Sequence, residues 1–196
     1  YMLDPLPPGT LLFPPQRTVW NTMPASKVHE VIIAVDPAGD GEDATVAVAM
    51  CMTPRGLHII DCLHHTGTME NAPGEVARFV RGLQAEGWLV IGAQVEGVGA
   101  WEFFRRELAK LLAPVRVAAD VPKVSKVERV LPLTVWHRAG ALSVDERLRG
   151  SPWDIEFHSF QQDGQTITGH DDCTDATAWA AQQRTRNWRA DPPTAA

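Results

Sequence analysis

The sequence of 196 residues lacks several features that mark particular classes of protein. Its three cysteines, Cys51, Cys62 and Cys173, form no CxxC pair, so neither a disulfide framework nor a zinc site is indicated. No apolar run approaches the roughly 20 residues that a membrane-spanning helix needs. The opening residues also lack the basic start and apolar core of a signal peptide. We therefore expect a protein that is not secreted, is not bound to a membrane and works inside a cell.

Positive charge is scarce as well. The chain has 18 Lys and Arg against 24 Asp and Glu, a net charge of −6. Such a balance argues against a general binder of polyanions, unless the acids gather at a metal site and the bases lie elsewhere. No GxxxxGK[ST] motif occurs, so these residues contain no P-loop ATPase site.

What the sequence does have is an apolar run that ends in an aspartate. Residues 31–35 are apolar and mostly β-branched, which is typical of a strand buried on both faces. Asp36 follows, then a turn rich in proline and glycine, and residues 45–50 can return antiparallel beside the first strand. Asp36 is thus expected at the carboxyl end of a central strand, where functional side chains of α/β sheets often lie. A simpler role is to cap the turn.

The remaining pattern predicts an α/β fold. Residues 1–28 are proline-rich and are expected to form a linker or arm outside the core. Further strands are expected at 57–63, 88–95 and 114–118, and helices at 71–87, 101–112, 126–139 and 174–186. This order implies a mixed five-stranded sheet, three antiparallel strands followed by parallel strands, with helices on both faces.

A second strand also ends in an acid. Glu96 follows the apolar run 88–95, and if the first and fourth strands pair in parallel, Asp36 and Glu96 become neighbours. A third acidic group comprises Asp171, Asp172 and Asp175, of which Asp172 and Asp175 share one helix face.

Carboxylates crowded in this way repel one another, and hard divalent cations relieve the repulsion. Two Mg²⁺ or Mn²⁺ ions on shared carboxylates suit phosphodiester hydrolysis. The alternative is that the acids near the last helix only start it on a solvated surface.

Basic residues and histidines add to the pattern. Lys123, Lys126 and Arg129 form the densest basic group and could hold DNA phosphates, or could form a solvated helix face. His170 lies beside the closing acids and could be a ligand, a proton carrier or a structural residue. His64 and His65 end a strand with no third ligand at metal spacing, and Cys173 is expected to pack against the sheet.

Four segments together resemble a known family: VDPAG at 35–39, VEG at 95–97, KVSKVER at 123–129 and HDDCTDA at 170–176. Over about residues 30–185 they look like the nuclease domain of tailed-bacteriophage terminase large subunits, an RNase H-like fold related to RuvC-type resolvases. The resemblance implies an endonuclease domain at 29–186, followed by a flexible tail at 187–196. That domain would use Mg²⁺ or Mn²⁺ to cut concatemeric double-stranded viral DNA during genome packaging in the host cytoplasm.

The resemblance also implies roles for particular residues and partners. Asp36, Glu96, Asp172 and Asp175 match the catalytic acids, and these four with Asp171 match the metal ligands. Asp43 matches an extra acid of some members. The implied partners are duplex DNA, an ATPase motor of the same full-length protein, a portal and a small terminase subunit.

Two other functions fit the same residues. A junction resolvase of this fold would be dimeric and would prefer branched DNA to linear duplexes. A docking module of a packaging motor, with acids that only cap turns, would neither nick plasmid nor gain thermal stability from divalent cations.

Overall fold

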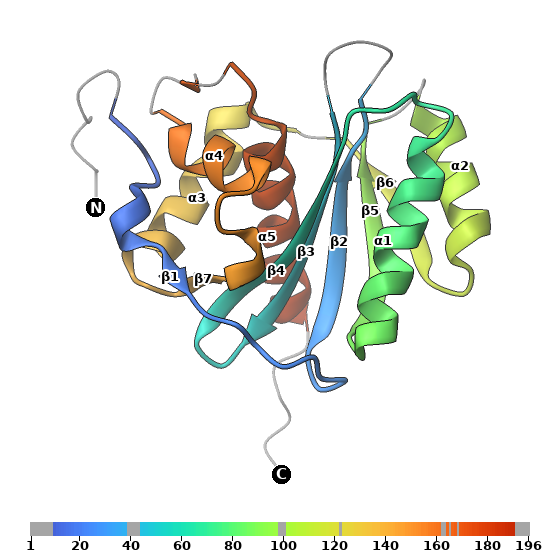
Figure 1. The fold of residues 1–196 in the computed structure, drawn as a ribbon, viewed down its shortest axis with the longest axis horizontal. Helices are drawn as coiled ribbons and strands as arrows, with labels where there is room; N and C mark the ends of the chain where they lie inside the picture. Colours follow the sequence, from blue (N-terminus) through green and yellow to red (C-terminus); the bar gives the residue numbers. More distant parts are fainter. Residues whose placement is uncertain are drawn as a thin grey trace.

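A computed structural model describes residues 10–38, 44–97, 101–121, 123–161, 164, 166–167 and 169–190. One mixed sheet, with the strand order β1-β7-β4-β3-β2-β5-β6, runs through the middle of the molecule. Helices cover both of its faces, α1 and α2 on one and α3, α4 and α5 on the other (Figure 1). The α/β class and the mixed sheet are as predicted, but the sheet has seven strands where five were expected.

The centre of the sheet follows from the apolar runs. Strand β2 (Glu30–Asp36) pairs antiparallel with β3 (Thr45–Thr53), which pairs antiparallel with β4 (Gly56–His65). On its other side β2 pairs in parallel with β5 (Leu89–Glu96), and β5 with β6 (Arg116–Asp120). Since β2 lies between two strands and under helices on both faces, only apolar side chains fit along its middle, and residues 31–35 are all buried.

Two short strands were not predicted. Strands β1 (Val19–Trp20) and β7 (Leu142–Val144) pair in parallel with each other, and β7 pairs in parallel with β4 at the edge of the sheet. Segments of two and three residues are too short to show a period of two, so they give no sequence signal.

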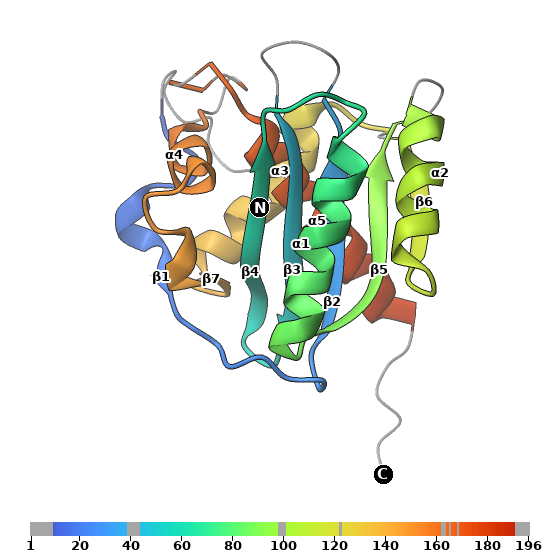
Figure 2. The same ribbon diagram turned by 45° about the vertical axis from the view of Figure 1, so that its right-hand side comes forward.

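Helices α1 (Ala72–Glu86) and α2 (Trp101–Leu112) form one outer layer. Helix α1 starts after Asn71, has proline in its first turn, and ends at Gly87, whose φ of +105° is unfavourable for residues with a side chain. Figure 2 shows α1 lying in front of the middle of the sheet, where it contacts β4 and β5. The core beneath this layer includes Val76, Val80 and Leu108.

The other layer consists of α3 (Lys126–Arg138), α4 (Pro152–Ser159) and α5 (Asp172–Ala190), with 3-10 turns at Pro15–Arg17 and Glu146–Leu148. Ser125 starts α3 with a capping box, because its side chain accepts from the Glu128 N–H while Glu128 accepts from the Ser125 N–H. Near the far end of α5, Arg184 lies 3.6 Å from Glu30, at the start of β2. Helix α5 therefore contacts β2 over most of the strand.

The N-terminal segment differs from the prediction. Leu12 and Phe13 are buried in the core on the α3–α5 side, and Phe13 stacks on Phe157 with ring centroids 4.1 Å apart. The expectation that residues 1–28 lie outside the core is therefore wrong for this part of the segment, because an apolar triplet at 11–13 sits among the prolines. In the described part of the chain, no helix combines the length and the hydropathy needed to cross a membrane.

Candidate metal centre

The two strand-end acids lie side by side, as the sequence predicted. Asp36 is the last residue of β2 and Glu96 the last of β5. The two strands run parallel and pair Val35 with Val95, so both acids lie at the carboxyl ends of neighbouring strands, on the same side of the molecule. The carboxyl ends of neighbouring parallel strands deliver two side chains to one place without any long-range adjustment.

A third acid comes from a helix. Asp175 lies in the first turn of α5 and its side chain is 4% exposed. One carboxylate oxygen from each of Asp36, Glu96 and Asp175 lies within 4.8 Å of the others. Three elements that are far apart in the sequence therefore bring carboxylates to one point, where a single cation could contact all three.

Crowding and burial change the proton affinity of these acids. Burial raises the pKa of Asp36 well above its ordinary value, and repulsion by Glu96 and Asp175 adds to the rise. Burial also raises the pKa of Asp175 to about 6, although the nearby Arg129 guanidinium opposes the rise. The cluster carries more negative charge than its neighbours neutralise.

Arg129 lies inside the cluster. Its Nη1 donates to Glu96 Oε1 at 2.6 Å and its Nη2 donates to Asp175 Oδ2 at 2.7 Å. The side chain is 6% exposed, so the predicted place for Arg129 in a row that contacts DNA does not match its position. A guanidinium fixed between two carboxylates has no free face for a phosphate, and its role is to hold those carboxylates.

Lys126 lies at the rim of the same cluster. Its Nζ lies 2.7 Å from Asp171 Oδ1 and 3.7 Å from Asp175 Oδ2, and its side chain is 37% exposed. The prediction that Lys126 and Arg129 share a helix face holds, since both contact Asp175. Lys126 reaches both the acids and solvent.

The donor set fits a hard divalent cation. Glu96 Oε2 and Asp175 Oδ1 are buried and have no hydrogen-bond partner among the described residues, although the other oxygen of each binds Arg129. An unpartnered buried carboxylate oxygen is costly, and carboxylate oxygens are the ligands that Mg²⁺ and Mn²⁺ prefer. The arrangement thus leaves one oxygen of Glu96 and one of Asp175 available for a metal ion.

The other predicted residues occupy different positions. Asp171 binds Lys126 and lies outside the three-acid group, whereas Asp172 begins α5 close enough to Asp36 to raise its pKa. Lys123 is exposed just before α3, and His170 is exposed just before α5. The extra acid, residue 43, falls outside the described residues, so its predicted role stays a prediction.

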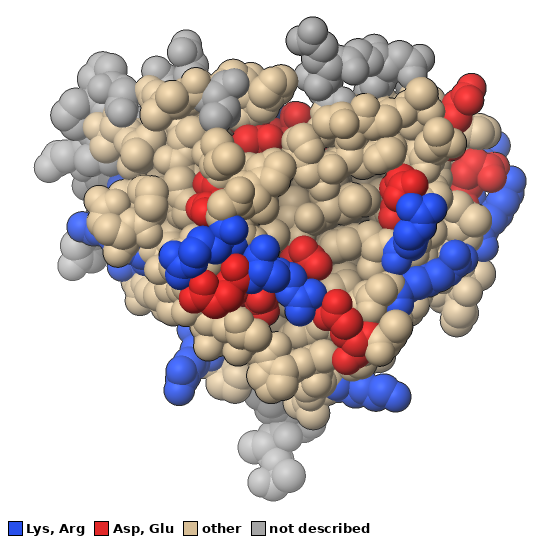
Figure 3. Space-filling model, in the orientation of Figure 1, with Lys and Arg blue, Asp and Glu red and all other residues tan. Residues whose placement is uncertain are grey.

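The surface charge is mixed. In the view of Figure 3, basic and acidic side chains lie next to each other on the coloured part of the surface instead of forming one broad basic area. This matches the net charge of −6. A wide electrostatic footprint for nucleic acid is not seen on this face among the described residues, so any DNA contact here would be local.

Comparison with known proteins gives structural matches only. No protein-family model matches the sequence, and no curated protein matches it. The nuclease domain of the human cytomegalovirus terminase, soaked with manganese and bound to an inhibitor, superposes with a TM-score of 0.64 at 14% identity, over 79% of this chain and 82% of that one.

Phage structures give similar values. The large terminase nuclease from the thermophilic phage G20c with bound cobalt has a TM-score of 0.61 at 17% identity, over 90% of this chain and 99% of that one. The nuclease domain of the large terminase subunit of bacterial virus Sf6 has a TM-score of 0.61 at 11% identity, over 88% and 98%. At these identities the likeness is one of fold: this chain has the RNase H-like architecture of terminase nuclease domains, as the sequence motifs predicted.

Proposed function

We propose that this chain is a metal-dependent endonuclease that cuts double-stranded viral DNA during genome packaging, as the nuclease part of a terminase large subunit. One observation carries the proposal. Asp36, Glu96 and Asp175 bring carboxylate oxygens within 4.8 Å of one another at the edge of an RNase H-like sheet. Fold alone does not determine function, so the proposal rests on this site and the fold likeness only supports it.

The metal ligands in this proposal are Asp36, Glu96 and Asp175, with Asp172 close enough to act on a second ion. Bound Mg²⁺ or Mn²⁺ would supply an activated water and neutralise charge on the departing oxygen of a phosphodiester. The chain supplies the frame. Two acids are fixed by the hydrogen-bonded ladder of β2 and β5, and the third by the first turn of α5.

Arg129 and Lys126 have separate tasks in this proposal. Arg129 holds one oxygen of Glu96 and one of Asp175, which orients the remaining oxygens. Lys126, half-exposed at the rim, and the exposed Lys123 contact the phosphate backbone. Such contacts position duplex DNA without reading its sequence, as a packaging enzyme requires.

The acidic balance has a consequence for DNA affinity. With a net charge of −6, this chain attracts DNA weakly, so the proposal includes a motor domain of the same protein that supplies most of the affinity. Contacts with a portal and a small terminase subunit are part of the same proposal.

Nicking of supercoiled plasmid tests the proposed activity. The assay compares the wild type with Asp36→Ala in Mn²⁺, Mg²⁺ and EDTA, and uses Glu75→Ala as a matched control, because Glu75 is an acid paired with Arg78 on α1, which covers the face of the sheet opposite to α5 (Figure 1). We expect metal-dependent nicked and linear DNA from the wild type and the control, and none from Asp36→Ala. Circular dichroism verifies that both variants fold.

Three other results would contradict the proposed activity or its site. Wild-type rates in Asp36→Ala at the same metal concentration would reject the site. No cleavage by the wild type in any metal, and none when the full-length protein is used, would reject the nuclease and favour a docking module. Preference for four-way junctions over linear duplexes would instead indicate a resolvase.

A further inference from the structure

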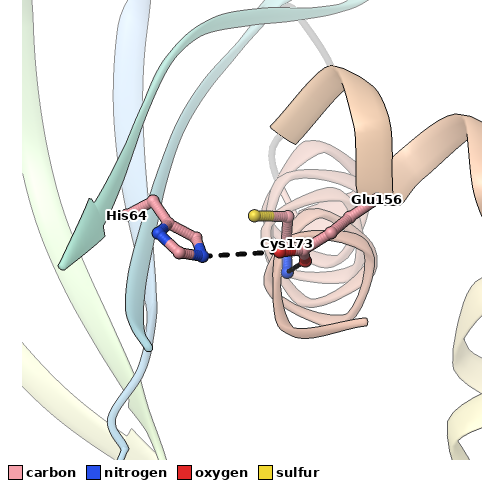
Figure 4. Close-up of side chains that lie close together, drawn as sticks. All are labelled: His64, Glu156 and Cys173. Atoms are coloured by element: carbon pink, nitrogen blue, oxygen red, sulfur yellow. Dashed lines mark hydrogen bonds and ion pairs between the residues drawn. The ribbon is translucent and has the colours of Figure 1, made fainter. Parts of the chain in front are cut away.

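A second cluster of metal-binding side chains lies apart from the three acids. His64 Nε2, a carboxylate oxygen of Glu156 and Cys173 Sγ lie within 4.8 Å of one another. Figure 4 shows the His64 ring on β4 directed toward Glu156 on α4 and Cys173 on α5. Three elements on one side of the sheet thus direct a nitrogen, an oxygen and a sulfur to the same point.

A fourth donor lies beside this group. Cys62 is two residues before His64 on β4, so both side chains leave the same face of the strand. The Cys62 thiol lies close enough to the Cys173 thiol to raise its pKa, while its own Sγ donates to the Leu63 carbonyl oxygen at 3.6 Å. No sequence pattern indicates this group, because its members are separated by up to about a hundred positions and form no CxxC or HxxxH motif.

The spacing of the donors is close to that of a bound ion. In a tetrahedral zinc site with bonds of about 2.0–2.3 Å, donor atoms lie about 3.3–3.8 Å apart. His64 Nε2 and Glu156 Oε1 are already 3.4 Å apart. The other oxygen of Glu156 accepts from the Cys173 N–H at 2.9 Å, which fixes the carboxylate and leaves Oε1 directed at the histidine.

Burial and access also fit a cation site. The Glu156 side chain is 7% exposed and Cys173 is fully buried, whereas the His64 side chain is 24% exposed and forms the open side. A buried carboxylate beside two sulfurs is costly in the absence of a positive charge. Softer donors, sulfur and imidazole, favour zinc over magnesium, which prefers oxygen alone.

We propose that His64, Glu156, Cys173 and Cys62 bind one Zn²⁺ ion, which joins β4, α4 and the first turn of α5. A thiol that binds the ion releases its proton to solvent. Zinc with four protein ligands has no open position, so the ion is structural. Two residues along a helix turn a side chain by about 200°, so Cys173 faces the zinc while Asp175 faces the acids. The ion would fix the turn that carries Asp175.

Cobalt substitution tests this site without any nuclease assay. The full chain is stripped with EDTA, returned to excess Mg²⁺ to occupy the acidic site, and titrated with Co²⁺ while thiolate-to-cobalt charge-transfer absorption is recorded. We expect the band to saturate at one Co²⁺ per chain and to disappear on addition of Zn²⁺. Co²⁺ binding without a thiolate band would overturn the proposal.

Variants separate the two sites. The band should be lost in Cys173→Ser, weakened in Cys62→Ser, and retained in Asp36→Ala, His65→Ala and Cys51→Ser. His65 is the matched control, because it neighbours His64 but leaves the opposite face of β4. If Cys173→Ser does not fold, His64→Ala replaces it, since His64 is partly exposed, and its Co²⁺ affinity should fall at least about tenfold. A full band in the folded variant, Cys173→Ser or His64→Ala, or a band lost in Asp36→Ala, would refute the site.

Discussion

Replacing Asp175 by asparagine should stabilise the metal-free protein, although Asp175 is buried and ion-paired. The substitution Asp175→Asn keeps the shape of the side chain and lets its oxygen still accept from Arg129, but removes a negative charge from a cluster that has too many. The effect has a definite pH dependence, because burial raises the pKa of Asp175 from 3.8 to about 6.

The magnitude follows from that difference. Below pH 3.8 the acid is protonated in both the folded and the unfolded chain and costs nothing. As the pH rises to about 6, the unfolded chain releases the proton while the folded chain retains it, so stability falls. At about 1.4 kcal/mol per pKa unit, the full cost above this range is about 3 kcal/mol. For a chain of this size, that corresponds to about 6–12 °C in the unfolding midpoint.

Thermal unfolding in EDTA from pH 4 to pH 8 measures the pH-dependent stability cost of Asp175. We expect wild type and Asp175→Asn to agree at the acid end, and the variant to gain about 6–12 °C by pH 8. Asp171→Asn, which makes the same charge change at the same helix start, is the control and should give no comparable gain. The reasoning would be refuted if the variant were less stable than wild type and the difference in unfolding midpoint were the same at pH 8 as at pH 4. The pair with Arg129 would then outweigh the burial cost.

Three other changes test neighbouring parts of the structure. Arg129→Met leaves Glu96 and Asp175 without their buried partner and should destabilise the metal-free protein by about 3–5 kcal/mol in urea unfolding. Mn²⁺ should restore much of this loss. No loss would mean that the guanidinium does not hold the acids. Trp153→Phe removes the buried 2.8 Å hydrogen bond to Thr177 and should cost about 1–3 kcal/mol in the same assay, with unchanged nicking. Lys123→Ala should weaken duplex binding by the full-length protein and reduce the salt slope by about 1, whereas an unchanged slope would remove this lysine from the DNA contacts.

The sequence predicted those parts of the site that are fixed by strand ends. Residues 31–35 and 88–95 are apolar enough to show where β2 and β5 lie, and parallel pairing then makes Asp36 and Glu96 neighbours. The acid on α5 was also predictable, because Asp172 and Asp175 open a helix. Choosing among the closing acids was not, since that choice depends on how α5 packs against the sheet.

The failures concern contacts between distant segments. Arg129 looked like a surface base, and only the packing of α3 against α5 places it between two carboxylates. Its position three residues after Lys126 was the one available signal, because it put both on a single face. His64 and Cys173 gave no signal at all, as nothing in the sequence indicates that the end of β4 meets the start of α5.

The attachment of α5 gives the acid site one fixed side and one adjustable side. Asp36 and Glu96 lie on adjoining strands, and the backbone hydrogen bonds between these strands restrict their relative movement. Asp175 lies on a helix of 19 residues, about 28 Å long, that is joined to the sheet by side chains: its buried face packs into the core, Arg129 pairs with Asp175, and Arg184 lies 3.6 Å from Glu30. A helix held by side chains can shift as a rigid unit relative to the strands. Breaking the contact of Arg184 with Glu30 would let the helix tilt and would move Asp175 relative to Asp36 and Glu96. A contact near Glu30 could therefore set the spacing of a metal site at the opposite end of β2.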